Sequence, residues 1–304
     1  MKKLRLIFYV VLLSFISNCT TPTKTNLSTQ KIAYSDEQPE NKRLGQILSF
    51  STDNKSNSEI LVIDLGQKIA FLIEKNGRIS ESISIESGQV LALNGMKEDF
   101  RPPTGIYSLE NDKKNQKPHF VSLLPVSKIK NSVREFSPLF VSSRIEEYAC
   151  RTKNCLAFKS QDMQKLSQRL SKGRLLTIIL RRGEWLSEES HSIRIQNMER
   201  FLNDWKTAWE SRDISRYMNL YASEFTNPNF SRKKWMNHKS NLFSNYKKIE
   251  IELGSKTILN FGSIYFAQFE QSFKSNSYSD VGVKTLVLSA DESPRIIFED
   301  WIKP

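Results

Sequence analysis

Cysteine and histidine are scarce in this chain, which has three of each among its 304 residues. Their spacing forms no recurring metal-ligand pattern, so we expect no metal ion and no cofactor. No motif supports a Ser-His-Asp triad either. The basic residues are not gathered into a block with interleaved aromatic residues, so we do not expect a nucleic acid partner.

Long hydrophobic runs are also missing. The apolar stretch at residues 6–13 is shorter than the ~20 residues that a membrane-spanning helix needs. It follows a basic start and precedes Cys19, which predicts a signal peptide over residues 1–18. Ile16-Ser17-Asn18-Cys19 resembles a bacterial lipobox, which implies cleavage before Cys19 and lipid on its sulfur. An ordinary signal peptide with an incidental cysteine is the alternative.

Acidic residues are outnumbered, 33 against 45 Lys and Arg, which gives a net charge of +12. A basic surface suits an anionic partner such as membrane headgroups or the carboxylates of a cell wall. The chain is 38% hydrophobic and 26% charged, as in folded proteins, and its length allows about two domains of roughly 150 residues. Together with this charge, the resemblance of residues 16–19 to a lipobox implies a lipid-anchored protein of the bacterial cell envelope that faces the periplasm.

Residues 19–57 are polar and predict a tether, within which the short run 44–50 is compatible with an edge strand. Apolar patterns then predict a strand-rich first domain over residues 58–181. Its expected strands cover residues 60–64, 68–73, 79–85, 105–109, 120–124, 139–141 and 175–180, with a turn at Asn76-Gly77 and a helix over 160–170.

Cys155 is the candidate nucleophile of this domain, because it follows a polar turn and leads into the predicted helix. The order of strands, the segment 103–107 and the stretch Arg151-Thr152-Lys153-Asn154-Cys155 together resemble the L,D-transpeptidase (YkuD-type) domain. That family consists of cysteine enzymes that cross-link or trim peptidoglycan stem peptides. The resemblance implies that Cys155 is catalytic and that its neighbours bind substrate, namely Ser142, Arg151, Thr152, Lys153 and Asn154.

The chain departs from the family motif, which is roughly His-Gly, a loop, then Ser-x-Gly-Cys-Ile/Val-Arg. Thr152 and Asn154 take the Ser and Gly places, and Ala157 stands where the family has Arg. Ser142 falls near the His-Gly position, and no histidine lies between His119 and Cys155. Arg151 and Lys153 are cationic neighbours of the kind that lowers a thiol pKa, but they cannot shuttle a proton as histidine does.

Two functions therefore remain open for this domain. In the first, the Cys155 thiolate attacks a stem-peptide carbonyl, and water or an amine resolves the thioester, as in a carboxypeptidase or a transpeptidase. In the second, the protein is a catalytically inactive lipoprotein that binds peptidoglycan or acts as a scaffold. A disulfide between Cys150 and Cys155, which form an even pair once Cys19 carries lipid, would favour the second function.

Residues 182–195 predict a linker, and residues 196–302 predict a second domain with three helices followed by an antiparallel sheet, so the whole chain is α+β with two domains. Apolar residues at helical spacing place the first helix around 198–209, a short second helix at 214–221 and a third, capped by Ser231, through 242. Expected strands cover residues 249–253, 265–273, 284–289 and 295–301.

This second domain resembles the nuclear-transport-factor-2-like (NTF2-like) cone fold. More narrowly, it resembles the version found in L,D-transpeptidase-related cell-shape proteins of helical and spiral bacteria. The matching segments are 205–213, 217–225, 231–235, 273–280, 284–286 and 299–301. The fold implies a pocket for a glycan strand, a peptide or a second protomer, and it leaves a homodimer through this domain open. For Trp205, Trp209, Phe269 and Trp301, we expect a place in the core rather than in a binding site.

Overall fold

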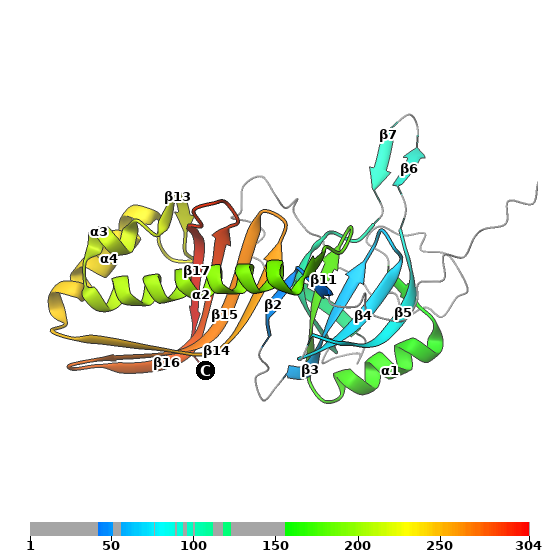
Figure 1. The fold of residues 1–304 in the computed structure, drawn as a ribbon, viewed down its shortest axis with the longest axis horizontal. Coiled ribbons are helices and arrows are strands. Elements are labelled where there is room, and N and C mark those ends of the chain that lie inside the picture. The colour runs from blue at the N-terminus through cyan, green and yellow to red at the C-terminus, as the bar shows by residue number, and fades with distance from the viewer. Residues whose placement is uncertain are drawn as a thin grey trace, which may run out of the picture. The chain divides into compact units, whose positions relative to one another are not determined.

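The computed structural model describes residues 42–50, 56–75, 77–88, 90–93, 96–99, 101–111, 118–122 and 156–303. They form an α+β structure with a strand-rich N-terminal part and a C-terminal part of helices and sheet (Figure 1). Several predicted features lie outside the described residues: the signal peptide, the strand 139–141 and the whole stretch 123–155. Within the described residues, no helix is both long enough and apolar enough to cross a membrane.

A seven-stranded sheet forms the N-terminal part, in the order β10-β5-β4-β3-β11-β8-β9. Its strands are β3 (Ser56–Asp64), β4 (Ile69–Glu74), β5 (Ile79–Ser87), β8 (Gly105–Asn111), β9 (Pro118–Ser122), β10 (Leu156–Phe158) and β11 (Arg174–Leu180). Strand β3 lies between two others, and its residues 60–63 are fully buried, which explains an apolar run without alternation. A separate hairpin joins β6 (Val90–Leu93) to β7 (Met96–Asp99).

Helix α1 (Ser160–Leu170) packs on this sheet through Met163, Leu166 and Leu170, which share one helical face. The predicted helix therefore has the observed limits. Beside this face, Arg169 forms ion pairs with Glu59 of β3 at 2.8 Å and with Glu81 of β5 at 3.0 Å. The predicted turn at Asn76-Gly77 has Gly77 at φ +80°, a backbone region that glycine adopts at little cost.

Asp64 joins the ends of two neighbouring strands. Its buried carboxylate accepts hydrogen bonds from the backbone N–H groups of Gly66, Gln67 and Gly183, at 2.7 to 3.0 Å. Gly66 and Gln67 follow β3, whereas Gly183 follows β11, which runs parallel to β3. The three donors satisfy the buried charge locally, so Asp64 has a structural explanation that requires no ligand.

The C-terminal part consists of three helices and a six-stranded sheet with the order β13-β17-β16-β15-β14-β2, whose last strand is β2 (Ile47–Ser49). The helices are α2 (Glu188–Ser211), α3 (Ile214–Met218) and α4 (Arg232–Asn245); the strands are β13 (Tyr221–Thr226), β14 (Ile249–Phe261), β15 (Ile264–Ser275), β16 (Ser279–Ser289) and β17 (Ile296–Ile302). Figure 1 shows the long helix α2 crossing this sheet. The pairs are antiparallel except for β13 with β17, which is parallel.

The segment predicted as a linker, 182–195, is instead regular structure. It contains β12 (Trp185–Ser187) and the first turns of α2, so the helix begins about ten residues before its apolar pattern. The Ser187 side chain caps the helix by accepting from the N–H of Ser190, and Glu188 and Glu189 lie in the first turn, where the helix dipole favours acidic groups.

Part of the predicted tether is also ordered. Strand β1 (Lys42–Leu44) pairs with β12, and β2 (Ile47–Ser49) pairs with β14 of the C-terminal sheet. An edge strand in the run 44–50 is thus confirmed. Leu48 of β2 belongs to the C-terminal core, which explains why these residues leave the polar pattern of the tether.

Two further predictions for the C-terminal part were wrong in detail. The second helix ends at Met218, and Tyr221 begins strand β13 rather than continuing that helix. Ser231 does precede the third helix, but its side chain makes no capping hydrogen bond.

Candidate functional site

The predicted nucleophile loop lies outside the described residues, together with all the site residues assigned to it and with the lipidation site. These residues are Cys19, Ser142, Cys150, Arg151, Thr152, Lys153, Asn154 and Cys155. The elements that follow Cys155 are described. Leu156 begins β10 opposite Ser87 of β5, and α1 and β11 come next in the predicted order. The scaffold immediately after the nucleophile position is therefore strand, helix and strand.

The segment 103–107 was predicted from the same resemblance, and it leads into β8 at Gly105. Tyr107 is buried and donates a hydrogen bond from its hydroxyl to the carbonyl of Pro103 at 3.1 Å. This contact closes the turn before the strand. Burial raises the pKa of Tyr107, so its hydroxyl stays protonated at neutral pH.

A second group of chemically active side chains lies inside the C-terminal domain. We call it the polar cluster and define it as Tyr217, Tyr221, Lys239, Lys284 and Glu299. All five side chains are buried. They come from α3, β13, α4, β16 and β17. Charged residues are rarely buried without a partner, which makes this cluster the candidate functional site among the described residues.

Glu299 is the centre of the polar cluster. Its Oε1 accepts from Lys284 Nζ at 2.6 Å, and its Oε2 accepts from the hydroxyl of Tyr221 at 2.6 Å. Burial alone would raise the pKa of Glu299, but the charges of Lys284 and Lys239 outweigh that effect and hold its pKa below the usual value. Glu299 is therefore ionised at neutral pH.

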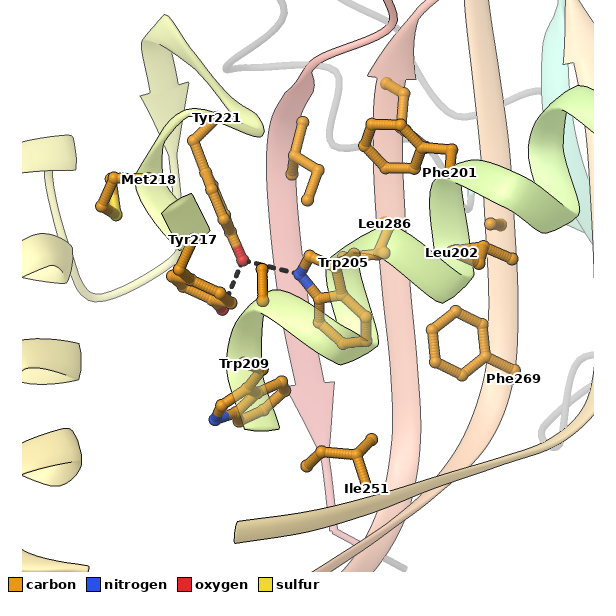
Figure 2. Close-up of a cluster of buried hydrophobic side chains, with 14 of the residues drawn as sticks. Phe201, Leu202, Trp205, Trp209, Tyr217, Met218, Tyr221, Ile251, Phe269 and Leu286 are labelled. Carbon is orange, nitrogen blue, oxygen red and sulfur yellow. Dashed lines mark hydrogen bonds between the residues drawn. The ribbon is translucent and has the colours of Figure 1, made fainter. Parts of the chain in front are cut away.

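Two tyrosines and a tryptophan extend this network. Trp205 donates from Nε1 to the Tyr221 hydroxyl at 2.9 Å, and the hydroxyls of Tyr221 and Tyr217 are hydrogen-bonded to each other. Figure 2 shows the Tyr221 hydroxyl between the Trp205 indole and the Tyr217 ring. Burial and the nearby Glu299 charge raise the pKa of both tyrosines, so both remain neutral.

Lys239 contacts aromatic rings, whereas Lys284 forms an ion pair with Glu299. The Lys239 Nζ lies 3.6 Å from the ring centroid of Trp209 and 4.5 Å from that of Trp235, as in cation–π contacts. Its side chain takes part in no ion pair with a residue that the structure describes. Burial lowers the pKa of Lys239 to about 7; Lys284 adds to this effect, while Glu299 opposes it. The amine is therefore close to its titration point at neutral pH.

One indole N–H group beside Lys239, Nε1 of Trp209, is buried without a hydrogen-bond acceptor within the described part of the chain. Figure 2 shows this nitrogen directed away from the Trp205 side of the domain. Trp235 differs, because its indole lies within hydrogen-bonding reach of the Tyr217 hydroxyl and so acts to lower the pKa of that tyrosine. Buried donors without acceptors are uncommon in folded proteins, so Trp209 marks an unusual place in the core.

We predicted core positions for Trp205, Trp209, Phe269 and Trp301. The first three are buried, whereas Trp301 is only partly buried and lies with its ring centroid 5.0 Å from Lys284 Nζ. Lys239 was not among the predicted site residues. Its spacing was a usable signal, because Trp235, Lys239 and Phe243 recur every four residues and so share one face of α4. For metal binding, the residues that the structure describes contain no group of three or more His, Cys, Asp or Glu positioned to hold an ion.

Comparison with known proteins identifies the C-terminal domain. Residues 197–300 match the model of the Cds6 C-terminal NTF2-like domain, so this part of the chain is an NTF2-like domain. The polar cluster lies entirely within it. No curated protein sequence matches the chain significantly.

Solved structures similar to the chain extend beyond this domain. Bd1075 from Bdellovibrio bacteriovorus matches with a TM-score of 0.72 and 24% identity, covering 86% of this chain and 100% of that one. The helical cell shape determining protein Pgp2 from Campylobacter jejuni matches with a TM-score of 0.60 and 18% identity, covering 84% and 95%. Its K307A mutant gives a TM-score of 0.62 at 18% identity, covering 86% and 94%. At these identities the likeness concerns the fold.

Proposed function

We propose that this protein is a lipid-anchored protein of the bacterial cell envelope that acts on peptidoglycan stem peptides through an acyl-enzyme on Cys155. The observation that carries this proposal is the extent of the structural match. It spans 84–86% of the chain, against a protein described as determining helical cell shape, and so includes the strand-rich domain as well as the NTF2-like one. Cell shape in bacteria depends on the cell wall, which contains these stem peptides.

The arrangement around Cys155 supports an L,D-transpeptidase-like domain. Strand β10 begins one residue after Cys155 and pairs with β5, and α1 packs behind it on the sheet. The pairing of β10 with β5 fixes the backbone from Leu156 onward, directly after the proposed nucleophile. In the proposed reaction, the Cys155 thiolate forms a thioester with the stem-peptide carbonyl and expels an amine. Water or a second amine then releases the product and regenerates the thiolate.

The test is product analysis by mass spectrometry after purified protein is incubated with muropeptides. Wild-type protein is expected to shorten or join stem peptides, and Cys155→Ala to do neither. Cys150→Ala is the matched control: it is expected to retain activity, and a gain in activity would mean that a disulfide normally masks Cys155. Identical products from wild type and Cys155→Ala would remove the enzymatic proposal.

A second candidate is a non-catalytic peptidoglycan-binding or scaffolding protein. The specific observation that favours it is the lack of histidine between His119 and Cys155, where the family supplies its base. Thiol titration of the mature protein separates the two candidates. A Cys155 that alkylates rapidly at neutral pH supports the enzyme, and one that is unreactive or bonded to Cys150 supports the scaffold.

A further inference from the structure

Residues 42–50, which we call the strap, bind two segments that are distant from each other in sequence. Strand β1 of the strap forms a two-stranded sheet with β12, and β2 pairs with β14 at the edge of the C-terminal sheet. Gln46 lies between β1 and β2 and bonds in both directions. Its carbonyl accepts from the N–H of Asn260 at 2.9 Å, and its side-chain Oε1 accepts from the N–H of Glu184 at 3.1 Å.

The strap also binds the first turns of α2. Arg43 donates from Nε to Oε1 of Glu188 at 2.6 Å, and His191 donates from Nε2 to the carbonyl of Ile47 at 2.7 Å. These bonds hold residues 184–191, which contain β12 and the start of α2. We call residues 184–191 the junction, because the chain passes through them from the first sheet to the NTF2-like domain.

Three apolar side chains anchor the strap. Leu44, Leu48 and Phe50 are buried, but only Leu48 belongs to one of the two described cores. Packing around the three is incomplete, because they are among the residues that line a cavity of about 270 Å³, which His191 and Ile195 of α2 also line. Side chains that border a void lose dispersion contacts on that side. The strap is therefore held less firmly than the strands inside each sheet.

The strap can open without the unfolding of either core. Its strands β1 and β2 contain three residues each, so the ladders that hold them are short. The ion pair between Arg43 and Glu188 adds little, because the two side chains are 31% and 51% exposed. Docking also costs the conformational entropy of nine residues. Segments of this kind open at a lower free energy than the cores on which they dock.

We propose that the strap is a releasable link that transmits load from the preceding tether to the junction. A pull on the tether reaches Lys42 first, so β1 leaves β12 before β2 leaves β14. Release deprives β12 of its partner strand and His191 of its acceptor, so the junction loosens between the first sheet and the NTF2-like domain. The partner that supplies the load is a lipid surface. Here the proposal rests on the proposed function, which includes a lipid on Cys19.

Hydrogen exchange of the full-length protein, followed by peptide mass spectrometry, tests whether the strap opens as one unit. Leu44→Ala removes an anchor that belongs to neither core. We expect the amides of Asn260 and Glu184, which both donate to Gln46, to exchange roughly tenfold faster or more, with β15 and β16 unchanged. Leu170→Ala, at a leucine of α1 with nearly the same exposure, is the matched control and should leave both amides unchanged.

Stretching of single molecules in optical tweezers, with the full chain attached through its two ends, tests the response to load. Release of the strap should be the first step, below the force that unfolds either domain, with a length gain of up to about 30 Å for nine extended residues. In Leu44→Ala, this step should occur at lower force or disappear, whereas Leu170→Ala should retain it.

Two results would overturn the proposal. One is a wild-type protein that shows no step before its domains unfold, and the other is a Leu44→Ala protein in which the exchange of Asn260 or of Glu184 does not change. Both measurements use purified protein without lipid or peptidoglycan. Their outcome is therefore independent of lipidation at Cys19 and of acyl transfer at Cys155, so failure of the strap and failure of the proposed function are distinguishable.

Discussion

Lys284 donates a hydrogen bond from Nζ to Oε1 of Glu299 across 2.6 Å, inside the NTF2-like domain, where the two side chains are 3% and 0% exposed. The pair joins neighbouring strands, because Lys284 lies on β16 and Glu299 on β17. Tyr221 binds the other oxygen of the same carboxylate. Burial makes each of these charges depend on the others, so the loss of one member should affect the whole domain.

Glu299→Gln should destabilise the NTF2-like domain by about 3–5 kcal/mol, because it leaves two buried lysines without a counter-charge. Thermal unfolding followed by tryptophan fluorescence measures this, since Trp205 and Trp209 lie beside the cluster. Glu292→Gln, at an exposed position, is the matched control and should unfold as wild type does. Equal unfolding temperatures for the two variants would mean that the buried carboxylate is not ionised.

Stability should rise with pH above 7 because of Lys239. Its pKa is about 7 in the folded protein and about 10.5 when unfolded, so between these values the unfolded chain binds more protons. Each pH unit in that range should add up to about 1.4 kcal/mol to the free energy of unfolding. Denaturant titrations at pH 7, 8 and 9 measure the slope, and Lys239→Met should remove this contribution. An unchanged slope in that variant would show that the lysine stays charged throughout.

Leu48→Ala should weaken the C-terminal domain, although Leu48 lies far from it in sequence. Leu48 is 5% exposed in β2 and packs in the C-terminal core, so its truncation should cost roughly 2–5 kcal/mol. Ile47→Ala, at the partly exposed neighbouring position, is expected to cost much less. Chemical denaturation followed by tryptophan fluorescence compares the two. If Leu48→Ala leaves the unfolding midpoint unchanged, β2 does not contribute to this domain in solution.

Much of the fold could be predicted because its elements carry a regular apolar period. Helix α1 has apolar residues at Met163, Leu166 and Leu170, and β3 has an uninterrupted buried run, so both were located correctly. The start of α2 was missed because its first turns are specified by the Ser187 cap and acidic residues, which show no apolar period. Tyr221 was predicted to lie in the second helix because its four-residue spacing from Tyr217 matches a helix. In the structure it begins β13, and its hydroxyl donates a hydrogen bond to Glu299.

The candidate site was less predictable. The resemblance led to Cys155 and its neighbours, which lie outside the described residues, so those assignments stay predictions. The polar cluster combines residues from five elements spread between Tyr217 and Glu299, and no local motif connects Lys239 to Glu299. The register of β16 with β17 places Lys284 near Glu299, and the buried face of α4 carries Lys239.

Intact-mass analysis of the protein during incubation with a pentapeptide stem tests the central proposal most directly. If Cys155 is the nucleophile, wild-type protein should gain the mass of the stem peptide less the departing amine, hydroxylamine should remove it, and Cys155→Ala should never acquire it. If wild-type protein remains unmodified and releases no product, while its Cys155 thiol is free to react with an alkylating reagent, the proposed acyl-enzyme is contradicted.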